Sequence, residues 1–260
     1  MTATFLIRLS LGIAAMWVLM PRNEVTDGFF RIQLRVVLGL AVLTALLLSA
    51  TTDGSADDPE TLLRRQTDGR IFWLQCGMAA TAYFGSICWA LGRRRPGTIS
   101  IFVIAGLGLL SLVADSYADA GVSGMSLQLI GGVSSALVLG SILTGMLLGH
   151  WYLTSPTMST RPLRFFITMI VIACALRAVS TGIAWAAHQD LLQQTTQMIW
   201  ISLRIAGAII APLIAAAMTH QVLKYRNTQS ATGILFACLI MVFMGEMSAA
   251  LLEGDLSVPF

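Results

Sequence analysis

The amino-acid sequence predicts an all-α, polytopic membrane protein, a bundle of about eight transmembrane helices, and three observations carry this prediction. Of the 260 residues, 56% are hydrophobic and 11% are charged, and the mean hydropathy is +0.78, whereas a soluble domain carries about a quarter charged residues. The apolar residues form long blocks, and roughly 18 uncharged residues suffice to cross a bilayer as a helix. These blocks are apolar on all sides, whereas the strands of a membrane barrel alternate over about ten residues.

Eight apolar blocks follow one another in what we interpret as one integral membrane domain, residues 1–260. We expect spans at about 5–20, 29–50, 71–91, 98–114, 127–149, 165–187, 196–218 and 231–252. The first block is followed by Pro21 without a small-x-small cleavage site, so we expect it to be a retained helix. Between the second and third spans, an Asp-Asp-Pro run at 57–59 predicts the start of a short surface helix that ends near Gln66.

Small residues mark the fifth span as a contact helix. Ser141, Gly145 and Gly149 recur at four-residue spacing and so form a ridge on one side of the helix. Small residues let neighbouring helices approach closely in a membrane. We therefore expect this helix to lie at the centre of the bundle.

Basic residues are distributed unevenly between the two ends of the predicted bundle. Cytoplasmic loops collect Lys and Arg, and the loops after the first, third, fifth and seventh spans hold ten basic residues, against four at the opposite end, where we count Arg8. With eight spans, this asymmetry predicts both termini outside, in a bacterial-type inner (plasma) membrane. Because the net charge of +3 comes from such short loops, we expect no nucleic-acid partner.

Three ionisable residues lie inside predicted spans rather than in loops. At about 1.5 Å per residue, Arg177 lies roughly 18 Å from the inner face, and Glu246 lies at about 22 Å. Arg204, counted from the outer face of a core of about 30 Å, also lies roughly 18 Å from the inner one. Charged residues at such depth normally face the bundle interior and pair. We expect Glu246 to pair with one arginine, which leaves one excess positive charge.

The helix faces around these residues favour an interior site. The side of the sixth span that carries Arg177 is small and polar, and the side of the seventh span that carries Arg204 is built from glycine and alanine at 207, 208, 211 and 215. Asp115 and Gln128 would line the mouth of the site toward the outer face. On the same seventh span, Pro212 removes a backbone donor and predicts a kink near residue 208.

Two histidines end predicted spans at the cytoplasmic side. His150 ends the fifth span, and His220 ends the seventh. On facing helices they would ligate a haem iron axially, bind a metal, or relay protons. The alternative is that each is an interfacial residue of the aromatic belt, as Trp151 and Tyr152 beside His150 indicate. Haem b or quinone is thus the cofactor that this hypothesis implies.

Three classes of function stay open from the sequence. The loops are short, and no set of nucleophile, base and orienting residue is recognisable, so we expect no enzyme acting on its own. The first class is a membrane subunit of a larger complex for electron transfer or proton handling, with other membrane proteins and the bilayer as partners. The second is a small transporter for an anionic or zwitterionic solute that binds near the midplane. The third is a structural or assembly factor in which the buried charges only specify packing.

Overall fold

The computed structural model describes residues 2–50, 59–154, 158–188 and 194–256, and these residues are all-helical, without strands. Eight stretches are long and apolar enough to cross a membrane, which confirms the predicted class and indicates a multi-pass membrane protein. The elements are α1 (Thr2–Leu19), a short turn η1 (Arg22–Glu24), α2 (Asp27–Ala50), α3 (Pro59–Ala90), α4 (Arg94–Thr154), α5 (Arg161–His188), α6 (Thr195–Ile205), a π-helical turn η3 (Ala206–Ile210), α7 (Ala211–Lys224) and α8 (Thr228–Leu256).

The observed spans follow the predicted ones, with one difference at α3. Seven spans start within four residues of the predicted positions, whereas the third begins at Leu62 instead of residue 71. The expectation of a separate surface helix that ends near Gln66 was wrong, because α3 runs without a break from Pro59 to Ala90. Packing explains the continuity: Thr67 is buried, and Arg64 reaches Asp115 of α4 at 3.5 Å. Residues 57 and 58 lie outside the described residues.

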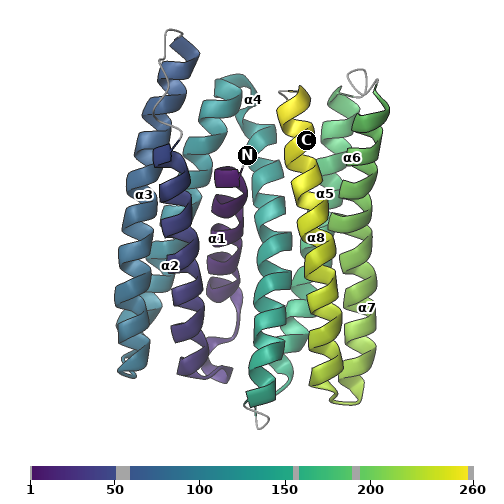
Figure 1. The fold of residues 1–260 in the computed structure, drawn as a ribbon. Helices are drawn as coiled ribbons and strands as arrows, with labels where there is room; N and C mark the ends of the chain where they lie inside the picture. Colours follow the sequence, from purple (N-terminus) through teal and green to yellow (C-terminus); the bar gives the residue numbers. More distant parts are fainter. Residues whose placement is uncertain (1, 51–58, 155–157, 189–193, 257–260) are drawn as a thin grey trace.

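Helix α4 contributes two spans, Arg94–Ala118 and Gly124–Thr154, that fold back on each other. A Cβ on Gly132 would lie 2.8 Å from Leu112 Cδ1, although twenty residues of straight helix would separate these positions by about 30 Å. The chain therefore reverses direction between the two spans, and Figure 1 shows this reversal at the upper end of the bundle.

The second half of α4 is central, as the small-residue ridge predicts. A Cβ on Gly145 would lie 3.2 Å from Phe166 of α5, and one on Gly149 would lie 2.6 Å from Thr232 of α8. On another side, Gly140 meets Gly12 of α1 so closely that a Cβ on Gly140 would lie 2.1 Å from the Gly12 carbonyl carbon. Only glycine permits this backbone-to-backbone contact.

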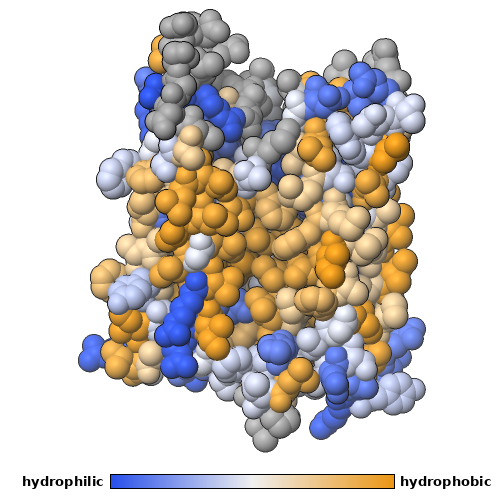
Figure 2. Space-filling model, viewed as in Figure 1, coloured by the Kyte–Doolittle hydropathy of each residue, from blue (hydrophilic) through white to orange (hydrophobic). Residues whose placement is uncertain are grey.

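The surface of the bundle divides into an apolar belt and two polar ends. Figure 2 shows hydrophobic side chains over the middle of the visible face and hydrophilic ones above and below. Large side chains in this belt are exposed, including Leu46, Phe84 and Ile99. Helix α1 begins, and helix α8 ends, toward the upper end of the bundle in Figure 1. An even number of spans requires this arrangement of the termini.

Candidate functional site: a buried arginine and glutamate cluster

Arg177 of α5 and Glu246 of α8 form a two-point ion pair in the bundle interior. Arg177 Nε donates to Glu246 Oε1 at 2.9 Å, and Nη2 donates to Oε2 at 2.6 Å. The guanidinium of Arg177 is fully buried, and Glu246 is 2% exposed. A planar guanidinium matches a carboxylate in this two-point geometry, which gives both charge neutralisation and a defined orientation. The predicted pairing of Glu246 with one of the two arginines is therefore confirmed.

Helix α4 supplies the remaining hydrogen bonds of the pair. Arg177 Nη1 donates to the Gly131 carbonyl at 3.0 Å and to Ser134 Oγ at 3.3 Å. Ser135 Oγ donates to Glu246 Oε2 at 2.5 Å. These partners satisfy the groups that a buried ion pair would otherwise leave without hydrogen bonds. Arg177 and Glu246 are thus held by three spans, those of α5, α8 and the second half of α4.

Arg204 of α6 is the other fully buried arginine. It is fully buried, yet its Nε, Nη1 and Nη2 atoms make no hydrogen bond within the part of the chain that the structure describes. Its charge interacts with those of Arg177, Glu246, Glu253 and Arg8. Of the two arginines expected near Glu246, Arg177 forms the ion pair, and Arg204 is the one left without a hydrogen bond among the described residues.

The chain around Arg204 departs from a regular α-helix. The π-helical turn η3 begins two residues after Arg204 and ends two residues before Pro212. Proline lacks a backbone N–H, so it cannot complete the regular ladder of hydrogen bonds, and a π-helical turn accommodates such a defect. The irregularity predicted near residue 208 is confirmed and takes this form.

Two glycines bring this irregular turn against α8 at the level of the ion pair. A Cβ on Gly207 would lie 2.4 Å from the Met241 carbonyl oxygen, and a Cβ on Gly245 would lie 2.7 Å from the Ala208 backbone nitrogen. Gly245 directly precedes Glu246. The glycines thus let the backbones of α8 and η3 touch next to Glu246.

Arg8 and Glu253 belong to the same buried network, and the sequence analysis missed both. Arg8 lies in α1 and is 5% exposed, so counting it with the outer loop charges was wrong. Its Nη2 donates to Glu253 Oε2 at 3.2 Å, and its charge also interacts with Glu246 and Asp115. Glu253 lies inside α8, which continues to Leu256. The position of Arg8 within the first apolar block was the signal that could have identified it.

Asp115 lies beside this network, not within the arginine and glutamate core. It is 4% exposed, and it forms an ion pair with Arg64 of α3 at 3.5 Å. The charge of Arg8 interacts with both Asp115 and Glu246, so Arg8 connects the two carboxylates electrostatically. Gln128, the other residue expected at the mouth, is buried as well.

His150 and His220 are exposed and lie on helices that do not pack extensively on each other. His150 ends the second half of α4, whose neighbours include α1, α5 and α8, and His220 lies on α7, which packs on α5 and α8. No group of three or more His, Cys, Asp or Glu side chains suited to a metal ion occurs among the described residues. Axial haem ligation by the two histidines stays a prediction.

The chain was compared with protein-family models, with curated proteins and with solved structures, and none of the three comparisons gives a match.

Proposed function

We propose that the protein is a membrane transporter for an anionic solute and that Arg204 is its binding residue. One observation carries this proposal: a fully buried guanidinium without a hydrogen-bond partner among the described residues. Insertion scales assign a cost of about 2.5–3.5 kcal/mol to an arginine at the centre of a membrane helix, and such residues normally pair. Arg177 donates four hydrogen bonds, and Arg204 donates none among the described residues, so an anion from outside the protein is the group that would complete the site.

The ligand class follows from the donors that Arg204 offers. A guanidinium presents five N–H donors in a planar fork, which suits carboxylate and phosphate oxygens. Glu246 is already bound by Arg177 and Ser135, so it is not free to bind the ammonium group of a zwitterion. We therefore favour an anionic over a zwitterionic solute.

Glu246 also gives the site a second state. It is a buried carboxylate whose charge interacts with those of both Arg177 and Arg204. In the empty carrier, Glu246 would balance both arginines. A bound anion would neutralise the charge of Arg204, and Glu246 would then balance the charge of Arg177 alone. The difference in contacts between the two states is what a ligand needs in order to shift a conformational equilibrium.

The π-helical turn supports movement at this position. Arg177 and Arg204 are fully buried, so the solute reaches them only when the helices move. Discontinuous helices next to a midplane site are typical of transporters. The turn Ala206–Ile210 lies between Arg204 and Pro212, and it would allow the outer and inner halves of this span to tilt separately.

The experiment is thermal unfolding of the full chain in mild detergent with chloride, phosphate, acetate or succinate at matched ionic strength. An anion at a hundred times its Kd stabilises the native state by about 2.7 kcal/mol, and we expect one of these anions to raise the Tm by several degrees. Arg204→Gln should abolish the rise, whereas Arg95→Gln, at an exposed position, should retain it. The stabilising anion is then tested for flux in proteoliposomes.

The anion-free stability of the variant separates this proposal from a purely structural role. Because Arg204 has no described hydrogen-bond partner to lose, Arg204→Gln should leave the Tm unchanged or raise it when no stabilising anion is present. A structural cluster predicts a loss instead. A destabilised Arg204→Gln protein, or the absence of any anion that distinguishes it from the wild type, would contradict the proposal.

We further propose that the protein lies in a bacterial-type inner membrane with both termini outside. The basic loops support this orientation, because the segments after α1, α3 and α7 contain Arg22, Arg93, Arg94, Arg95, Lys224 and Arg226. Loops rich in Lys and Arg face the cytoplasm. Assembly with other membrane subunits, including those of an electron-transfer complex, stays a prediction.

A further inference from the structure

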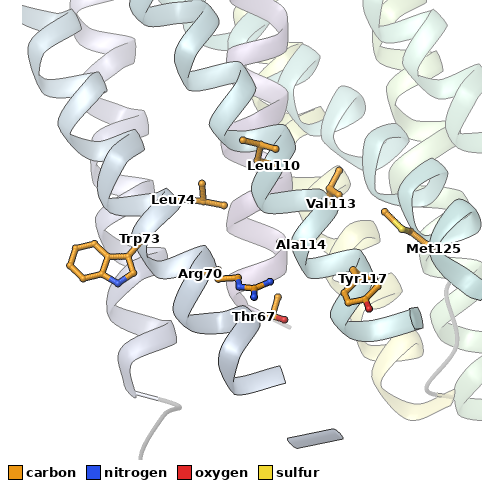
Figure 3. Close-up of a pocket in the computed structure, with 9 residues that line it drawn as sticks. All are labelled: Thr67, Arg70, Trp73, Leu74, Leu110, Val113, Ala114, Tyr117 and Met125. Carbon is orange, nitrogen blue, oxygen red and sulfur yellow. The ribbon is translucent and has the colours of Figure 1, made fainter. Parts of the chain in front are cut away.

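A groove on the membrane-facing side of the bundle lies between α3 and the first span of α4. It has a volume of about 670 Å³, and its lining includes Thr67, Arg70, Trp73, Leu74, Leu110 and Tyr117. Figure 3 shows Thr67, Arg70 and Tyr117 toward one end of the groove and Leu74 and Leu110 toward the other. The groove is therefore amphipathic along its length.

The length of α3 would place the polar end of the groove at the level of the lipid headgroups. Arg70 precedes the end of α3 at Ala90 by twenty residues, which is about 30 Å of helix and equals the thickness of the hydrocarbon core. Trp73, one turn deeper, is 74% exposed, and Tyr117 is 42% exposed. Tryptophan and tyrosine at this depth are typical of the boundary between headgroups and acyl chains.

Arg70 gives the polar end its charge. Its side chain is exposed and extends from α3 toward α4 across the groove (Figure 3). It forms no ion pair among the described residues. Two described acidic residues of this region, Asp68 and Asp115, each lie within 4 Å of Arg64. A cation at one end of an apolar groove suits a ligand that has an anionic headgroup and a hydrocarbon chain.

We propose that this groove binds an anionic phospholipid of the adjacent leaflet, with its phosphate on Arg70 and an acyl chain along Leu74 and Leu110. Tyr117 offers a hydroxyl group beside the phosphate, and Trp73 lies at the level of the glycerol. The site is separate from the Arg204 site and does not depend on the proposed transport function. It would hold one lipid in a fixed position against the hairpin between α3 and α4.

The test is native mass spectrometry of the full chain after exchange into detergent with equal amounts of phosphatidylglycerol and phosphatidylcholine. We expect one phosphatidylglycerol to be retained preferentially and Arg70→Gln to weaken its binding about fivefold, the contribution of one basic residue near an anionic surface. Arg65→Gln is the matched control, because Arg65 is exposed on the same helix but does not line the groove. Ala114→Trp, which fills the groove, should prevent retention.

Other occupants give different results. Equal retention of both lipids, or equal losses in Arg65→Gln and Arg70→Gln, would overturn the proposal in favour of nonspecific surface attraction. Displacement of the bound lipid by glycerol phosphate would show that the headgroup alone is recognised and would also overturn it. A second copy of the chain or another protein retained in place of the lipid would do the same. As an independent readout, phosphatidylglycerol with brominated chains should quench wild-type fluorescence more than that of Trp73→Phe.

Discussion

Arg177 and Glu246 face each other across α5 and α8, with both nitrogen-to-oxygen distances below 3.0 Å and neither side chain more than 2% exposed. The pair lies where α4 contributes two serines and a carbonyl group. It therefore joins three spans. Arg204, in contrast, lies in the same interior without a hydrogen-bond partner among the described residues.

Removing one member of the Arg177–Glu246 pair should destabilise the protein. We expect Glu246→Gln to lower the free energy of unfolding by about 3–5 kcal/mol, because it leaves a buried arginine uncompensated. The double variant Arg177→Gln/Glu246→Gln should recover part of this loss. Equilibrium unfolding in mixed detergent gives the four values of the double-mutant cycle. Purely additive losses would show that the two side chains are not energetically coupled.

The close contact of α1 with α4 predicts an unequal response to two glycine substitutions. Gly140→Ala places a methyl group 2.1 Å from the Gly12 backbone, where no side-chain rotation relieves the clash, and we expect a loss of about 3 kcal/mol. Gly39→Ala lies in α2 with no atom within 4 Å of the added carbon. There we expect a gain of up to about 1 kcal/mol, because alanine is the better helix former. Comparable Tm values for the two variants would contradict the described packing.

The partly buried ion pair of Arg8 and Glu253 should contribute more than the surface pair of Arg161 and Glu24. Glu253→Gln removes the ion-pair partner of a buried arginine, and we expect a loss of about 2 kcal/mol, in the range of hydrogen bonds to charged groups. Arg161 is 81% exposed at its side chain, so Arg161→Gln should cost at most about 1 kcal/mol. Unfolding measured at low and high salt checks both values, since only the surface pair should weaken with salt.

The π-helical turn predicts that stability and transport respond to Pro212 in opposite directions. Pro212→Ala restores a backbone donor, so the span should become more regular and the Tm should stay equal or rise. Transport of the anion that stabilises the wild type should become slower, because the hinge is stiffer. Pro96→Ala is the control, since Pro96 lies in the first turn of α4, where proline is tolerated. Unchanged flux in Pro212→Ala would argue against a hinge at this turn.

The proposed orientation can be tested by labelling single cysteines with an impermeant maleimide on intact cells. The four native cysteines, Cys76, Cys88, Cys174 and Cys238, are free and are first replaced by serine. Gln66→Cys should be labelled on intact cells, whereas Arg95→Cys should react only after permeabilisation. Both positions are exposed. The reverse pattern would place both termini in the cytoplasm.

The candidate site was only partly predictable, and its residues show why. The depth of Arg177 and Glu246 follows from counting along their helices, and the two side chains indeed meet. Arg177 and Arg204 were predicted at the same depth, so depth could not decide which of them pairs with Glu246. Arg8 was counted only among the charges at the outer end, because its partner Glu253 is 245 residues away in the chain.

The sequence by itself determined the class, the number of spans and their approximate bounds, because the bilayer selects for long apolar runs and this selection is local in the chain. It also placed Arg177, Arg204 and Glu246 inside the spans. Only the tertiary structure decided which arginine Glu246 binds, which backbones touch at Gly12 and Gly140, and where the groove beside Arg70 lies. The physical reason is that helices apolar on all sides carry little information about their rotation and neighbours, so these contacts depend on packing between distant segments.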